Sequence, residues 1–190
     1  MKLLKEPEER IRWLKPDEAK RLEAACSPEL WQLVQAARFT GLRQAELVAL
    51  RKADVDLKRQ LLTVRQSKSN RPRVLPITAD LVPVLKAAVA SSEHDRIFSS
   101  SLGTPWTVSG VNSAWQRATC RAEISDLRFH DLRHDFATSL RRHGVGIDVI
   151  SKLLGHSDLR TSKRYTHLGE DQLRDAVGAL SAGAKRGAKK

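Results

Sequence analysis

The chain has 190 residues, 41% of them hydrophobic, and its 34 Lys and Arg against 22 Asp and Glu give a net charge of +12. This length favours one globular domain with a sizeable core over two separate domains. The excess of basic residues is typical of proteins that bind polyanions, with nucleic acid as the leading partner. A solvated basic surface without such a partner remains the alternative.

Cysteine usage and hydropathy favour an intracellular protein. Cys26 and Cys120 lie far apart and lack metal-ligand spacing, so we expect both thiols to be reduced and neither to act as a nucleophile. The first 15 residues carry charges throughout, and no apolar run approaches the ~20 residues of a membrane span. The sequence therefore predicts a cytoplasmic protein with no membrane partner.

Two helices are predicted near the start of the chain. The first covers residues 15–26, where Pro16 is tolerated in the first turn. The second covers residues 27–39, with Gly41 as its stop signal. One face of the second helix is apolar at helical spacing and carries Leu30, Leu33, Val34 and Ala37.

Strand-like alternation follows these helices. Apolar residues alternate with charged or polar ones around Val55 and Leu57, and again around Leu62 and Val64 after a turn. The segment RVLPI, residues 73–77, resumes the pattern after the polar stretch 66–72, which contains Lys68. We therefore expect a three-stranded antiparallel sheet with Lys68 in its second turn.

Helical periodicity returns from Asp80 onward and continues after a Gly/Pro loop at residues 99–106. The sheet is thus an insertion between helices, and the fold class is α+β, mainly α-helical. The apolar residues that define these two helices are Val84, Leu85, Ala88 and Val89 in the first, and Val111, Trp115 and Ala118 in the second.

Residues 130–143 form a further predicted helix that ends at Gly144. Its core stripe consists of Leu132, Phe136 and Leu140. A different face gathers His130, Arg133, His134 and Ala137. The pair of histidines four residues apart is similar to the zinc-binding H-E-x-x-H motif, but Asp131 replaces the glutamate and Arg133 would place a cation beside the metal.

Two short helices are expected at residues 147–154 and 158–165. Gly155 suits the end of the first, Ser157 suits the N-cap of the second, and His156 falls in the sharp turn between them. A last amphipathic segment runs from Leu168 to Leu180.

Tyr165 is the only tyrosine in the chain, and it follows Lys163 and Arg164. A tyrosine needs a nearby base or a positive field to act as a nucleophile, because its pKa is near 10. If the electrophile is a phosphodiester, arginines are its natural stabilisers, because they stay charged and donate two hydrogen bonds at once. The alternative interpretation is a half-buried tyrosine that only packs.

Five segments occur in order along the chain and together resemble the tyrosine recombinases, the phage integrase family. They are TGLRQAEL with Arg43, RQSKSNRPRVLPI with Lys68, HDLRH with His130 and Arg133, LLGH with His156, and RYTH with Tyr165. The resemblance covers residues 12 to 180 and implies an integrase-type catalytic domain. Residues 1–11 would be an N-terminal extension and residues 181–190 a basic, disordered tail, with the family's N-terminal core-binding domain absent.

The resemblance also implies a role for each candidate catalytic residue. Tyr165 would attack the scissile phosphate and form a 3′-phosphotyrosyl link. Arg43 and Arg133 would clamp the non-bridging oxygens, and His156 would donate a further hydrogen bond. Lys68 would protonate the leaving 5′-oxygen, and His130 would assist removal of the tyrosine proton. Glu46 and His134 are expected to orient or support the site, and no metal or other cofactor is required.

The function implied is site-specific recombination of double-stranded DNA by a homotetramer assembled on the recombining sites. Accessory DNA-bending factors are further candidate partners, and the family points to a prokaryotic, phage or mobile-element origin. The apolar spacing between Leu168 and Leu180 suggests packing on a neighbouring protomer, although an intramolecular helix would show the same spacing. Two alternatives stay open: DNA relaxation like that of type IB topoisomerases, and an inert DNA-binding module.

Overall fold

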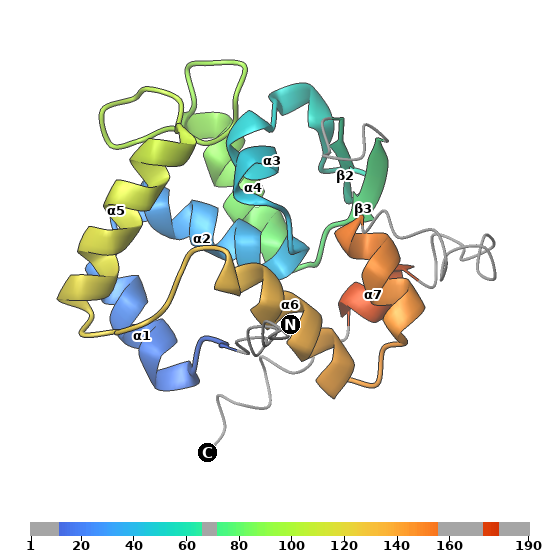
Figure 1. The fold of residues 1–190 in the computed structure, drawn as a ribbon. Helices are drawn as coiled ribbons and strands as arrows, with labels where there is room; N and C mark the ends of the chain where they lie inside the picture. The colour runs from blue at the N-terminus through green and yellow to red at the C-terminus, as the bar shows by residue number, and fades with distance from the viewer. Residues whose placement is uncertain (1–11, 66–71, 156–172, 179–190) are drawn as a thin grey trace, which may run out of the picture.

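The computed structural model describes residues 12–65, 72–155 and 173–178. Helices make up most of this fold, and a small sheet lies at one side, next to α7 (Ile147–Leu154) (Figure 1). The sheet has three antiparallel strands in the order β1-β2-β3. The predicted fold class, mainly α-helical with a small antiparallel sheet, is therefore confirmed.

The helix α2 (Pro28–Thr40) lies at the centre of the helical part and packs against α4 (Leu81–Ser91) and α6 (Asp131–Arg142). It begins after Ser27, whose hydroxyl accepts a hydrogen bond from the Leu30 backbone N–H at 3.3 Å. It ends at Gly41, which adopts the left-handed conformation with φ of 63°. All four residues of its predicted apolar face are buried: Leu30, Leu33, Val34 and Ala37.

The first helix, α1 (Pro16–Ala25), and α5 (Val108–Arg121) pack against each other. Within α5, the predicted core residues Val111, Trp115 and Ala118 are buried. The Trp115 indole donates a hydrogen bond to the Leu127 carbonyl at 2.9 Å, which fixes the segment that leads into α6. Periodicity therefore predicted both helices and the inward face of α5.

Two short elements after Gly41 are absent from the sequence-based prediction. They are α3 (Gln44–Ala49) and a 3₁₀ turn at Lys52–Asp54. A helix of six residues covers fewer than two turns, so hydrophobic periodicity cannot identify it. Its first turn depends instead on a carboxylate cap from Glu46, which accepts a hydrogen bond from the Arg43 backbone N–H at 2.9 Å.

The strands are β1 (Val55–Asp56), β2 (Leu61–Val64) and β3 (Arg73–Pro76). Leu62 pairs with Leu75 across β2 and β3, and both side chains are buried. Leu57 lies outside β1, because the chain turns there and Gln60 adopts a positive φ of 55°. The predicted first strand is therefore shorter than its apolar alternation suggested.

The core stripe predicted for α6 is confirmed, since Leu132, Phe136 and Leu140 are buried. The prediction that Arg133 shares a polar face with His134 is wrong in one respect. Arg133 is only 5% exposed, whereas His134 is exposed. The long arginine side chain reaches inward to buried backbone carbonyls, which helical spacing alone does not reveal.

Near the C-terminal end, residues 173–178 are helical, and Leu173, Ala176 and Val177 belong to the chain's own core. Arg174 donates a hydrogen bond to the Arg59 carbonyl at 2.9 Å, at the turn between β1 and β2. In this single chain the segment packs intramolecularly, the alternative that its apolar spacing left open, and packing on a neighbouring protomer stays a prediction. Several predictions for the C-terminal part and the chain ends lie outside the described residues. They are the helix 158–165, the turn at His156 and Ser157, the residues Leu168 and Leu180, and both terminal extensions.

No helix in the described part of the chain is long and apolar enough to cross a lipid bilayer.

The packing around Gly41 predicts a large effect of one added methyl group. A Cβ on this residue would overlap Phe136 Cδ1 and lie 2.8 Å from Leu154 Cδ2, at a φ of +63°. We expect Gly41→Ala to lower the free energy of unfolding by about 2–5 kcal/mol, because left-handed strain and overpacking add. Urea unfolding measures this loss.

Gly103→Ala is the matched control, since Gly103 also has a positive φ of +73° but nothing within 4 Å of an added Cβ. Its free energy of unfolding should fall only by the cost of the backbone strain, about 1–2 kcal/mol. Equal losses in the two variants would contradict close packing at Gly41.

Candidate active site

Arg43 stands at the start of α3 and is held there by Glu46. Its backbone N–H donates to Glu46 Oε2 at 2.9 Å, and its Nη1 donates to Glu46 Oε1 at 3.2 Å. The Glu46 side chain is only 5% exposed, while that of Arg43 is 29% exposed. The buried carboxylate thus fixes the backbone of Arg43 and leaves part of its guanidinium open to solvent.

Arg73, on β3, makes the closest contacts to the same carboxylate. Its Nη1 donates to Glu46 Oε1 at 3.0 Å, and its Nη2 donates to Glu46 Oε2 at 2.8 Å. Its Nε donates to the Leu153 carbonyl in α7 at 3.2 Å. Gly155 leaves room for this side chain, because a Cβ there would lie 2.9 Å from Arg73 Nη1. One side chain therefore joins β3, α3 and the end of α7.

Sequence reasoning assigned no role to Arg73. The signal available was weak: a basic residue at the edge of the apolar run RVLPI, which reads equally well as a solvated strand end.

Arg133, from the first turn of α6, is buried between two helix ends. Its Nη1 donates to the Gly41 carbonyl at 2.6 Å, and its Nη2 donates to the Leu154 carbonyl at 2.7 Å. These carbonyls stand just after α2 and at the end of α7, where helix dipoles concentrate negative partial charge. The buried guanidinium is therefore held by backbone groups, with no side-chain carboxylate bonded to it among the described residues.

The charges of these groups influence one another. Burial, together with the positive charges of Arg43 and Arg73, lowers the pKa of Arg133 to about 10, while the negative charge of Glu46 opposes this shift. Burial would raise the pKa of Glu46, but hydrogen bonds from Arg73 and from the Arg43 backbone hold it below its usual value. Within the described residues, three guanidinium groups thus act around one ionised carboxylate. The cluster carries an excess of positive charge that suits an anion.

His130 stands immediately before α6 and is exposed at the surface. Its ring meets the ring of His134 edge-on, with centroids 5.3 Å apart. Partial desolvation of its ring lowers the pKa of His130 below the usual 6.5, and His134, Arg133 and Arg43 act in the same direction. A neutral imidazole at pH 7 can accept a proton.

Arg43, His130 and Arg133 are thus brought into one electrostatic neighbourhood from α3 and α6. The other three candidate residues, Lys68, His156 and Tyr165, lie outside the described residues. Glu46 contacts Arg43, as expected of an orienting partner, and His134 contacts His130.

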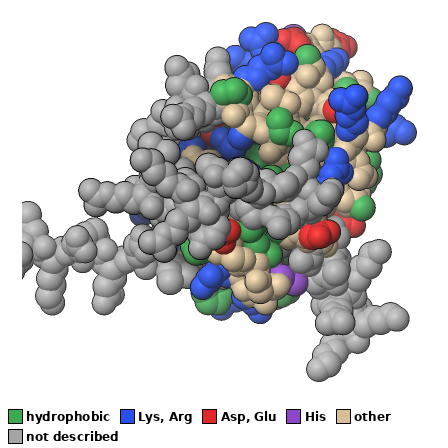
Figure 2. Space-filling view, turned by 90° about the vertical axis from the view of Figure 1, so that its right-hand side faces the viewer, with side chains coloured by type: hydrophobic (Ala, Val, Ile, Leu, Met, Phe, Trp, Pro, Cys, Tyr) green, Lys and Arg blue, Asp and Glu red, His purple; other side chains and the backbone are tan. Residues whose placement is uncertain are grey.

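The surroundings of this cluster combine polar and apolar side chains. A hollow of about 350 Å³ beside His130 is lined by side chains that include Gln44, Asn112 and Arg128. Gln44 donates to Asn112 Oδ1 at 2.9 Å and so links α3 to α5. On the face shown in Figure 2, Lys and Arg side chains form several separate groups between apolar and polar ones.

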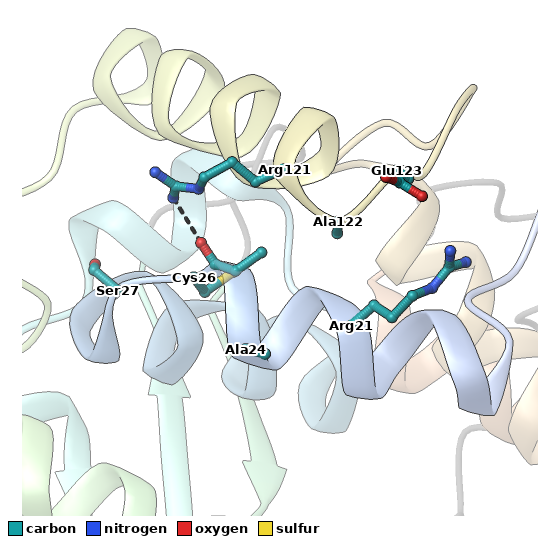
Figure 3. Close-up of a pocket in the computed structure, with 8 residues that line it drawn as sticks. Arg21, Ala24, Cys26, Ser27, Arg121, Ala122 and Glu123 are labelled. Carbon is teal, nitrogen blue, oxygen red and sulfur yellow. Dashed lines mark hydrogen bonds between the residues drawn. The ribbon is translucent and has the colours of Figure 1, made fainter.

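A larger cleft of about 650 Å³ lies between α1 and α5, away from the arginine cluster (Figure 3). It is lined by Arg21, Cys26 and Arg121, among others, and Arg121 donates to the Ala25 carbonyl at 2.6 Å. Burial raises the pKa of Cys26 to about 11, so this thiol stays protonated at neutral pH. Of the candidate catalytic residues, the three that the structure describes, Arg43, His130 and Arg133, do not line this cleft.

In the described part of the chain, no three His, Cys, Asp or Glu side chains are grouped so that they could hold a metal ion.

Comparison with known proteins gives a consistent result. The integrase of Salmonella phage P22 is 36% identical over 177 residues, which cover 86% of this chain and 46% of that protein. The crystal structure of XerA recombinase has a TM-score of 0.70 at 30% identity and covers 89% of this chain and 65% of that one. A lambda integrase tetramer bound to a Holliday junction has the same fold, with a TM-score of 0.68 at 22% identity, over 80% of this chain and 49% of that one.

The chain spans about half the length of the curated relatives it matches. The sequence model of the phage integrase family matches residues 12–172, which is most of the chain and includes all five segments of the predicted resemblance. The chain belongs to the phage integrase family.

Proposed function

We propose that this chain is the catalytic domain of a tyrosine site-specific recombinase, which cuts and rejoins DNA through a 3′-phosphotyrosyl intermediate. The observation that carries the proposal is the arginine cluster of the described residues, where Arg43 and Arg73 bind the Glu46 carboxylate and the charge of Arg133 acts on the same group. A buried excess of positive charge is unfavourable unless an anion joins it. A phosphodiester fits both the charge and the family.

In the proposed reaction, the Tyr165 oxygen attacks the scissile phosphorus and the bond to the 5′-oxygen breaks. Lys68 gives a proton to the departing 5′-oxygen, and His130 accepts the proton of the tyrosine hydroxyl. His156 donates a hydrogen bond to the phosphate. The phosphotyrosyl bond retains the energy of the phosphodiester, so a 5′-hydroxyl from a second strand can reverse the step without ATP.

Arg43 and Arg133 would bind the non-bridging oxygens, on which negative charge increases in the transition state. A guanidinium has five N–H donors, and the contacts to Gly41 and Leu154 occupy one donor on each terminal nitrogen of Arg133. Donors therefore remain for a phosphate oxygen. Because Arg133 is held by backbone carbonyls, it needs little reorganisation when the substrate arrives, and this preorganisation is the main electrostatic source of catalysis.

The partners proposed are double-stranded DNA and three further copies of the chain, which together form a tetramer on two recombining sites. The net charge of +12 supports DNA binding. The lambda integrase of similar fold was crystallised as a tetramer on a Holliday junction, which supports the same assembly here. We further propose accessory DNA-bending factors, a catalytic domain that covers residues 12–180, and a cytoplasmic site of action in a prokaryotic host.

The covalent step provides the first test. Incubation with nicked suicide duplexes in EDTA, followed by an SDS quench, should yield DNA-linked wild-type protein and none with Tyr165→Phe. The chemistry assigned to arginine, lysine and histidine needs no metal ion, so EDTA should not lower the yield. The variant should bind the duplex as tightly as wild type, because the hydroxyl is a small part of the contact.

Three outcomes would contradict the proposal in different ways. An adduct that persists in Tyr165→Phe would show another nucleophile. Absence of an adduct on DNA that the protein binds would indicate an inert binding module. Relaxation of a supercoiled plasmid without any exchange between two sites would indicate topoisomerase-like activity.

The lowered pKa of His130 predicts the acid limb of the pH profile. A protonated imidazole cannot accept the tyrosine proton, so the rate of adduct formation should fall only below pH 6.5, the usual pKa of histidine. We expect His130→Gln to slow adduct formation by about 10²-fold and to remove this limb. His134→Gln is the control and should retain the limb. If the wild-type rate already begins to fall at a pH above 6.5 as the pH is lowered, His130 is not the base.

A further inference from the structure

Arg73, on β3, lies outside the six candidate catalytic residues, yet it contacts two other elements of the site, α3 and the end of α7. We infer that Arg73 is a positioning residue: it neutralises Glu46, so that Arg43 keeps its positive charge available for the scissile phosphate. This inference rests on the proposed function, because it concerns the same phosphate site.

Arg73 makes more and shorter side-chain hydrogen bonds to Glu46 than Arg43 does. Arg73 donates one bond to each carboxylate oxygen, at 3.0 and 2.8 Å. The Arg43 side chain donates only one, at 3.2 Å, and its other contact comes from the backbone N–H. Arg73 is also the more buried of the two, with 12% of its side chain exposed against 29% for Arg43. Glu46 is therefore mainly the ion-pair partner of Arg73.

Loss of Arg73 would change the state of Arg43. The buried Glu46 carboxylate would keep Arg43 as its remaining side-chain partner among the described residues. A buried carboxylate without its ion-pair partner is strongly unfavourable, so Arg43 would be drawn into a full ion pair with it. Its charge would then be neutralised inside the protein, and its donors would turn away from the phosphate.

The chain contains an internal comparison for this arrangement. At α1, the buried Glu18 accepts a hydrogen bond from the Lys15 backbone N–H at 3.0 Å and is clamped by both Nη atoms of Arg12, at 2.9 and 2.7 Å. This matches the capping of α3 by Glu46 and its clamp by Arg73. Within the described residues, however, no second arginine side chain contacts Glu18. A two-bond clamp on a capping glutamate is thus a structural feature of this fold. The additional hydrogen bond from a second arginine, Arg43 to Glu46, is found only at the site among these two clamps.

The test compares Arg73→Gln with Arg12→Gln, which removes the same kind of two-bond clamp from Glu18, a carboxylate to which Arg43 donates no hydrogen bond in the described structure. Both variants should lose unfolding free energy in urea. At saturating protein, Arg73→Gln should form the phosphotyrosyl adduct about 10- to 100-fold more slowly, because Arg43 is misplaced and partly neutralised. Arg12→Gln should stay within about twofold of wild type, as expected for a change with no contact to the reacting groups. Equal rates in Arg73→Gln and wild type would overturn the inference.

The double variant Glu46→Gln with Arg73→Gln separates charge from packing. It removes both charges and leaves an amide oxygen that can still accept the Arg43 backbone N–H. If Arg73 acts through the charge of Glu46, this variant should recover at least part of the rate lost in Arg73→Gln, a coupling that double-mutant analysis detects. A double variant slower than Arg73→Gln would overturn the role in charge balance.

A second measurement does not depend on strand cleavage. The Arg43 Nε–Hε resonance, followed by NMR during a titration with inorganic phosphate, reports anion binding at this side chain. We expect Arg73→Gln to weaken this binding about tenfold and Arg12→Gln to leave it unchanged. If wild type forms no adduct but phosphate binding follows this order, the proposed function fails and the role of Arg73 stands. Unchanged phosphate binding in Arg73→Gln would overturn that role.

Discussion

The ion pair between Glu46 and Arg73 is the interaction on which the site depends. Arg73 on β3 binds the Glu46 carboxylate of α3 and also donates to the Leu153 carbonyl of α7, so that one side chain joins the three elements. Buried ion pairs stabilise a fold only when their remaining hydrogen-bonding groups are satisfied. Glu46 meets this condition with four hydrogen bonds, two from Arg73 and two from Arg43. The pair therefore acts as a rigid support for Arg43.

Around this pair, the described residues carry an excess of positive charge. Arg133 sits at 5% exposure against two backbone carbonyls, and burial together with its cationic neighbours brings its pKa down to about 10. A buried charge costs free energy unless it is paired, and among the described residues no carboxylate is hydrogen-bonded to this guanidinium. Its retention makes sense if an anion completes the cluster, because enzymes commonly exchange stability for a preorganised site. Under the proposed function, stability is thus balanced against a site preorganised for phosphate.

Sequence reasoning succeeded where local periodicity decides the structure. The 3.6-residue pattern identified α1, α2, α5 and α6, and alternation identified the sheet, because each of these elements buries one regular face. It failed for α3, whose formation depends on one capping carboxylate over six residues. For residues 173–178 it left two alternatives open, because an apolar stripe can pack on the chain's own core or on a neighbouring protomer; in this single chain it packs on the chain's own core.

For the candidate site too, one part could be predicted from the sequence and another could not. The order of five short segments in the sequence was enough to group Arg43, His130 and Arg133, and the fold brings these three residues together. The contacts of Arg133 and Arg73 could not be predicted, because their acceptors are carbonyls and a carboxylate that are distant in sequence. Arg133 and Gly41 are 92 residues apart, and Arg73 and Glu46 are 27 residues apart. Such tertiary hydrogen bonds produce no periodic pattern in the sequence.

The central claim is that Arg43 and Arg133 converge on one phosphate that Tyr165 attacks. The most direct measurement is a crystal structure of the protein on a nicked duplex with orthovanadate, which adopts the five-coordinate geometry of the transition state. The account predicts vanadium bonded to the Tyr165 oxygen, Arg43 and Arg133 on its equatorial oxygens, and Arg73 still paired with Glu46. Vanadium bonded to another side chain, or Arg43 turned fully toward Glu46 and away from the vanadate, would contradict it.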